Sequence, residues 1–273
     1  MYLFLTDETN FPPKRSGFFI YGGLIIEAAR VPELHNAIMK VRAKHGYAAG
    51  ENLKFSNQAK KDAAVHLAAK TDALEACLNA GAKFVATVVL EQVLRKKSQP
   101  EYMGYALNIM TVAYHEFLFA RGDDGYGALL IDRVDKREVN SVLESMVDRF
   151  QTGLEMPEGY NFVVNDRIVL FGMTSNNASH LSSCADIALG SFRYCVNAAT
   201  GHENAKPEIA KVLMPSLDKL FWRRDFAATT GAPRLGYRPY PKSFTVEWTG
   251  EQYARLARTL ASYVGTAASS ELN

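Results

Sequence analysis

The chain has 273 residues, of which 48% are apolar, and it carries a formal net charge of +2. This length suits one large domain or two small ones, with ample material for a hydrophobic core. Aromatic residues at 11% and charged residues at 22% argue against a disordered chain. The small net charge excludes the global basic field that is typical of many nucleic-acid-binding proteins. A nucleic-acid partner would therefore need a local basic patch.

The cysteines and the apolar runs predict a cytoplasmic protein without a membrane partner. Cys77, Cys184 and Cys195 form no CxxC pair and cannot all be paired, so we expect reduced, buried thiols. Asp7 and Glu8 interrupt the apolar start, and we expect no signal peptide. No apolar run approaches the roughly 20 residues needed to span a membrane. The sequence leaves the oligomeric state open.

The first elements along the chain predict an antiparallel hairpin. Residues 2–6 and residues 18–26 are apolar runs typical of buried strands, and the Pro- and Gly-containing segment 11–17 connects them. Gly22 and Gly23 lie inside the second run. A glycine pair there indicates a bulge or the close approach of another backbone.

Hydrophobic periodicity predicts the remaining elements, which alternate between helices and strands and so favour a mixed α/β domain. Helices are expected over residues 31–45, 58–80, 101–119, 137–150, 179–198, 209–222 and 252–264, and strands over 83–90, 126–131 and, as a strand or hairpin arm, 162–170. Gly81 is expected to end the second helix. Residues 223–243 are expected to be irregular, and residues 265–273 to form a frayed tail.

Four acidic residues stand out by their positions in these elements. Asp7 and Asp132 each end an apolar strand, Asp186 lies inside an apolar helix, and Glu51 opens the segment Glu-Asn-Leu-Lys-Phe. A carboxylate in such surroundings is costly unless it is solvated, hydrogen-bonded or bound to a cation. Oxygen-only ligands suit Mg²⁺ or Mn²⁺. Two such ions about 4 Å apart would activate a water and stabilise the leaving oxygen in phosphodiester cleavage.

Each of these acids also has a simpler interpretation. Asp186 is either a functional acid or a structural one that caps its helix or pairs with Arg193 or Arg133. Glu8 is the alternative to its neighbour at the end of the first strand, because adjacent strand residues point to opposite faces and only one of them would line the site. Asp135 is an alternative ligand near the end of the later strand, or an exposed turn residue.

The candidate substrate contacts are basic. Lys54, close to the candidate glutamate, is expected either to hold a phosphate or a site acid, or to be a surface lysine. The irregular C-terminal segment carries cations that could meet phosphates and aromatic rings that could stack on bases, unless it simply packs on the surface. These residues are Arg223, Arg224, Arg234, Arg238 and Lys242, interleaved with Trp222, Tyr237 and Tyr240.

The same pieces, in this order, resemble a known family. They are the strand ending in Asp7, residues 19–26, residues 51–55, the strand ending in Asp132, and the Ala-Asp-Ile-Ala-Leu-Gly helix segment 185–190. Together they resemble the family listed as domain of unknown function 3800, which is regarded as ribonuclease H-like. The resemblance implies a mixed sheet flanked by helices with helical insertions, in a single domain over 1–273 that includes a C-terminal helical and loop extension over 200–273.

The resemblance also implies a metal-dependent nuclease acting on RNA or DNA. Its catalytic residues and its Mg²⁺ or Mn²⁺ ligands would be Asp7, Glu51, Asp132 and Asp186. The basic residues predicted above, Lys54, Arg223, Arg224 and Arg238, would be its substrate contacts.

Three departures from the family pattern keep other functions open. The first aspartate is usually followed by Glu-Ser-Gly, whereas residues 8–10 are Glu-Thr-Asn. The usual Asp-Ser before the last helix is replaced in residues 174–177, and the usual glutamine before the Ala-Asp pair is replaced in residues 182–184. The alternatives are a catalytically inactive binding module of a defence or mobile-element system, and a small-molecule hydrolase that uses the same metals.

Overall fold

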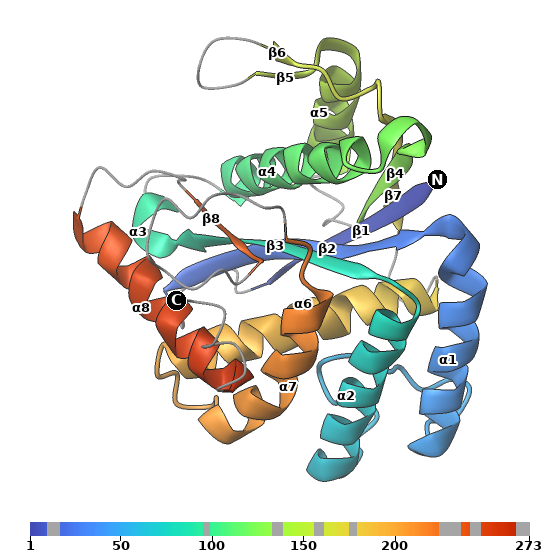
Figure 1. Cartoon of the computed structure of the whole chain (residues 1–273), viewed down its shortest axis with the longest axis vertical. Coiled ribbons are helices and arrows are strands. Elements are labelled where there is room, and N and C mark those ends of the chain that lie inside the picture. Colours follow the sequence, from blue (N-terminus) through green and yellow to red (C-terminus); the bar gives the residue numbers. More distant parts are fainter. Residues whose placement is uncertain are drawn as a thin grey trace.

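The computed structural model describes residues 1–9, 17–94, 99–132, 139–155, 161–174, 179–223, 236–240 and 247–265. Within these ranges the chain forms a mixed six-stranded sheet with helices on both faces, which confirms the predicted α/β class (Figure 1). The strands of this sheet are β1 (Tyr2–Thr9), β2 (Phe18–Glu27), β3 (Lys83–Leu90), β4 (Gly127–Asp132), β7 (Ile168–Thr174) and β8 (Arg238–Tyr240). A separate small hairpin consists of β5 (Leu154–Glu155) and β6 (Asn161–Phe162).

The sheet grows in two directions from the first strand. On one side, β1 pairs antiparallel with β2, as predicted, and β2 pairs antiparallel with β3. On the other side, β4 and then β7 are added, and both run parallel to β1. The complete order is β7-β4-β1-β2-β3-β8, with β8 parallel to β3 at the edge. The chain therefore changes its direction of growth between β1 and β4.

The helices form layers on the two faces of the sheet. They are α1 (Val31–Lys44), α2 (Ala63–Asn79), α3 (Glu91–Leu94), α4 (Gln99–Phe119), α5 (Val139–Thr152), α6 (His180–Ala199), α7 (Pro207–Leu220) and α8 (Glu247–Val264), with single 3-10 turns η1 (Ala28–Arg30) and η2 (Gly122–Asp124). α4 packs on β2 and β3 from one face, and α6 packs on β1 and β2 from the other. Figure 1 shows α1, α2 and α7 beyond α6, on the side away from the sheet.

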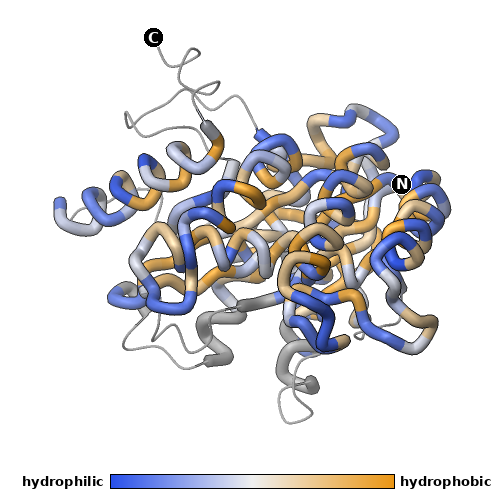
Figure 2. The backbone as a smooth tube through the Cα atoms, turned by 90° about the horizontal axis from the view of Figure 1, so that it is seen from below, coloured by the Kyte–Doolittle hydropathy of each residue, from blue (hydrophilic) through white to orange (hydrophobic). Residues whose placement is uncertain are grey.

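Alternation along the strands builds a separate core on each face. Leu5 belongs to the cluster that also contains α1, α2, α6, α7 and α8, whereas its neighbour Phe4 belongs to the cluster beneath α4. Segments with apolar residues accordingly gather in the middle of the molecule, and segments with hydrophilic residues lie mostly at its periphery (Figure 2). α6 is buried along most of its length, because one side meets the sheet and the other meets α7 and α2.

Local signals explain where several elements begin and end. α2 starts at Ala63, later than predicted, because the side chain of Asp62 caps it by accepting a hydrogen bond from the Ala64 amide. α2 ends before Gly81, as predicted, and Gly81 itself has a positive φ of 73°. In β2, a Cβ atom on Gly23 would clash with the carbonyl oxygen of Leu5, so the predicted close backbone approach is confirmed.

Two predictions about elements were wrong. Residues 162–170 form no single arm, because a turn separates the end of β6 from the start of β7. β8 lies inside the segment expected to be irregular.

All three cysteines are free and buried, as predicted. None of the helices in the described ranges has the length and apolar character needed to cross a membrane.

Candidate active site

The parallel pairing of β1 with β4 brings two of the predicted acids side by side. The register pairs Thr6 with Ile131, so the next residues of the two strands, Asp7 and Asp132, are adjacent. Neighbouring strands lie about 4.8 Å apart. Asp132 is the last residue of β4, but the prediction that Asp7 ends its strand was wrong, because β1 stays paired with β2 as far as Thr9. Both acids lie toward the carboxyl ends of their strands, at the point where the sheet changes its direction of growth, which is where open α/β sheets bind their ligands.

Both carboxylates lie on the α6 face of the sheet. Residues two apart in a strand share a face. Leu5 belongs to the core cluster on the α6 side and Leu130 packs against it, so Asp7 and Asp132 point toward α6 as well. One carboxylate oxygen of Asp132, Oδ1, is buried.

α6 supplies a third acid and a cation to the same region. Burial lowers the pKa of the Arg193 guanidinium, and the negative charges of Asp186 and then Asp7 oppose that effect. Arg193 is therefore within electrostatic reach of an acid from the helix and an acid from β1. The sequence interpretation of Asp186 as a partner of Arg193 agrees with this arrangement. Asp186 has a second role, because its Oδ2 accepts a hydrogen bond from the backbone amide of Phe55 at 2.6 Å.

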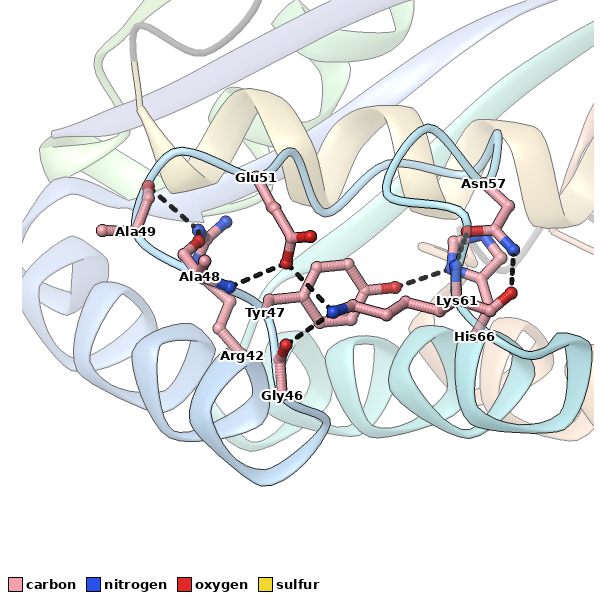
Figure 3. A network of polar contacts seen from close by, with 9 residues as sticks. All are labelled: Arg42, Gly46, Tyr47, Ala48, Ala49, Glu51, Asn57, Lys61 and His66. Carbon is pink, nitrogen blue, oxygen red and sulfur yellow. Dashed lines mark hydrogen bonds and ion pairs between the residues drawn. The ribbon is translucent and has the colours of Figure 1, made fainter.

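Glu51 contacts its own loop. Its Oε2 accepts a hydrogen bond from the Ala48 amide at 2.8 Å and forms an ion pair with Lys61 at 3.1 Å (Figure 3). These two contacts, the backbone one first, lower the pKa of Glu51. The buried Arg42 holds the same loop by donating to the carbonyl oxygens of Ala48 and Ala49. Glu51 thus stabilises the loop between α1 and α2, and its role as a metal ligand stays a prediction.

The backbone of Phe55 is fixed at both ends. Its amide binds Asp186, and its carbonyl oxygen accepts a hydrogen bond from Nε2 of His66 at 3.0 Å. Because Nε2 must carry the proton, Nδ1 accepts the hydrogen bond from the Tyr47 hydroxyl at 2.7 Å. Burial lowers the pKa of His66 and so favours this neutral form. The segment that carries Lys54 is therefore held between α2 and α6.

The ring of Phe55 lies against α6 and is covered by two cations. A Cβ atom on Gly190 would clash with Phe55, so the missing side chain at that position makes room for the ring. The guanidinium of Arg193 lies 5.3 Å from the ring centroid, and Nζ of Lys70, from α2, lies 4.3 Å from it. Asp186, Gly190 and Arg193 are spaced by four and three residues on one side of α6.

The carboxylates fit a hard divalent cation in chemical type, since their donors are all oxygens. In the described ranges, however, no group of three or more His, Cys, Asp or Glu side chains is arranged to hold a metal ion. Asp7 and Asp132 are brought together by the sheet, Asp186 is linked to Asp7 through Arg193, and Glu51 faces Lys61. Binding of Mg²⁺ or Mn²⁺ by these four acids stays a prediction.

The predicted basic contacts have varied surroundings. Arg238 is on the edge strand β8, where it forms an ion pair with Glu116 at 2.7 Å and lies over the Trp222 ring. Arg223 forms an ion pair with Asp218. Lys54 is partly exposed. Arg224, Arg234 and Lys242 lie outside the described residues, as do the alternatives Arg133 and Asp135.

The two cations over the Phe55 ring were not predicted as functional residues. No role was predicted for Lys70, and Arg193 was predicted only as a partner for Asp186. The signal was the spacing of His66 and Lys70, two basic residues four apart on a largely apolar helix. Comparison of the chain with known protein families, with curated proteins and with solved structures finds no match.

Proposed function

We propose that this protein is a divalent-metal-dependent nuclease with a ribonuclease H-like fold, which hydrolyses phosphodiester bonds in RNA or DNA. The observation that carries the proposal is the adjacency of Asp7 and Asp132 toward the carboxyl ends of two parallel strands, on the face covered by α6. The order β3-β2-β1-β4-β7, an antiparallel meander continued by two strands parallel to the first, supports this fold. The family resemblance of the sequence points to the same chemistry.

In this proposal the strand-end acids are the principal ligands. Asp7, Asp132 and Asp186 hold the cation, with Glu51 from the adjoining loop as the fourth predicted acid. A bound Mg²⁺ or Mn²⁺ supplies an activated water and stabilises the charge on the leaving oxygen. The chain itself orients the carboxylates. The sheet aligns the first two, and the hydrogen bond from Phe55 fixes the side chain of Asp186.

The proposal is tested by cleavage of short labelled RNA and DNA oligonucleotides in the presence of Mn²⁺. We expect Asp7→Asn and Asp132→Asn to abolish cleavage, because each change removes a negative charge but keeps the size of the side chain. The matched control is Asp123→Asn, at an exposed position in η2. Unchanged cleavage by the Asp132→Asn protein, with the control also active, would overturn the assignment.

A second candidate function is a non-catalytic binding module. The observation that favours it is Arg193, whose positive charge is attracted by both Asp186 and Asp7. In this case an internal guanidinium, instead of a metal ion, balances the partly buried acids. Calorimetric titration with Mn²⁺ separates the two functions. Absence of binding at millimolar Mn²⁺ supports the module, and binding that Asp132→Asn weakens supports the nuclease.

A further inference from the structure

Lys70 is a nearly buried cation that has no ion pair with an acid in the described part of the chain. Its residue is 9% exposed, on the side of α2 that faces Phe55. Among the described residues, no carboxylate forms an ion pair with its ammonium group. A buried charge of this kind is costly unless something compensates it. The ring of Phe55 supplies part of the compensation through a cation–π contact.

The positive charge of Arg193 disfavours the charged form of Lys70 further. Burial and then repulsion by Arg193 lower the pKa of Lys70 to about 8. Asp186 and Asp7 act on Arg193, but neither contributes to the pKa shift of Lys70. The two cations over the ring are therefore in different electrostatic environments. Arg193 is balanced by carboxylates, whereas Lys70 has a positive charge that an anion could neutralise.

We propose that Lys70, with Arg193 and the ring of Phe55, forms an anion-binding site beside the candidate carboxylates, and that this site takes a phosphate group of a nucleic-acid substrate. The identity of the anion rests on the proposed nuclease function, whereas the site itself rests on the two cations.

The surroundings keep this site in a fixed shape. Phe55 is tied to α6 through Asp186 and to α2 through His66, so the ring that both cations contact has little freedom. A phosphate oxygen accepts charge-assisted hydrogen bonds from an ammonium and from a guanidinium, and these are stronger than neutral ones. Because the side chains of the site need little ordering when the anion binds, most of the interaction free energy contributes to affinity.

The test measures binding of a short fluorescein-labelled single-stranded oligonucleotide by anisotropy, in EDTA and over a series of NaCl concentrations. We expect Lys70→Met to weaken binding by about tenfold, as expected for one lost hydrogen bond to a charged group. It should also reduce the dependence of log K on log salt by about 0.7, the value for one phosphate contact on a single strand. A purely structural role for Lys70 would leave this salt dependence unchanged.

Two control variants complete the experiment. Lys70→Arg keeps the charge and should retain the wild-type salt dependence, and Lys40→Met, on the exposed side of α1, should match the wild type in affinity. The site is refuted if Lys70→Met binds like Lys40→Met, or if the wild type does not bind. Mn²⁺-dependent cleavage is measured separately. Loss of binding in Lys70→Met with no cleavage by the wild type would support the anion site and contradict the nuclease.

Discussion

Phe55 donates its backbone N–H to Oδ2 of Asp186 over 2.6 Å, a contact between residues 131 positions apart. The bond ties the loop after α1 to a helix almost half the chain length away. On the same residue, the carbonyl oxygen of Phe55 is held by His66. Asp186 is therefore both a charged group near Arg193 and an anchor for the loop, and these two roles can be separated by mutation.

The first prediction concerns the anchoring role of Asp186. Asp186→Ala leaves the Phe55 amide without its acceptor and removes the charge that attracts Arg193, so we expect a loss of about 2–3 kcal/mol in the free energy of unfolding. Asp186→Asn keeps an acceptor oxygen and should lose about 1 kcal/mol. Urea unfolding measures both. An alanine variant as stable as the wild type would contradict the anchoring role.

The second prediction concerns the space left by Gly190. Gly190→Ala places a methyl group against the Phe55 ring and should cost about 1–3 kcal/mol, despite the better helix propensity of alanine. The control is Gly104→Ala in α4, where the nearest atom to a new Cβ is 3.8 Å away on Arg149. That change should be neutral or stabilising. Thermal or urea unfolding of the two variants separates the effect of the clash from that of helix propensity. Equal changes in the free energy of unfolding for Gly190→Ala and Gly104→Ala would show that the Phe55 ring does not pack against α6.

The fold followed from the sequence wherever apolar patterns were continuous. The strands β1, β2 and β3 and the helix α6 were placed within a few residues, because each has a long apolar run with a clear end. β8 was missed because Arg-Pro-Tyr has no alternating pattern and depends on pairing with β3. The interruption between β6 and β7 contains Asn165 and Asp166, residues that favour a turn over a continuous strand.

The site was only partly predictable for a different reason. The adjacency of Asp7 and Asp132 follows once β1 and β4 pair in parallel, and strand-end acids alone suggested it. The contacts of Phe55 with α2 and α6 depend on how two distant helices pack, which periodicity does not encode. Glu51 shows the limit most clearly, because its ion pair with Lys61 involves a loop whose path no sequence pattern specified.

The third prediction concerns pH and His66. Burial, the largest effect, lowers the pKa of His66 in the folded protein below the ordinary value of about 6.5. Below that pH the unfolded chain takes up a proton that the folded protein does not, so stability should fall as pH decreases until the folded pKa is reached. Above about pH 6.5 this contribution is constant. Urea unfolding at a series of pH values measures the fall.

A variant assigns that fall to His66. His66→Gln should make the loss of stability between about pH 6.5 and 5 shallower, because the titrating ring is absent. His180, whose pKa burial also lowers, contributes a fall of the same sign that remains in the variant. The control is His202→Gln, in the turn after α6. Identical pH profiles for the wild type and His66→Gln would show that the ring is not kept neutral by its contacts.

The fourth prediction concerns competition between Arg193 and a metal ion. Because Arg193 is attracted by Asp186 and Asp7, its charge should repel a divalent cation bound to the same acids. Arg193→Met should therefore tighten Mn²⁺ binding by about tenfold, or roughly 1.4 kcal/mol, while it lowers the stability of the metal-free protein. Calorimetry measures the affinity, and unfolding in EDTA measures the stability.

The matched control is Arg258→Met, at an exposed position on α8, which changes the net charge by the same amount. It should leave Mn²⁺ affinity unchanged, so that any gain in Arg193→Met is a local effect. Weaker or unchanged Mn²⁺ binding in Arg193→Met would show that the acids and the guanidinium do not share a metal site. If neither the wild type nor Arg193→Met binds Mn²⁺, the guanidinium has a structural role, as expected for a non-catalytic module.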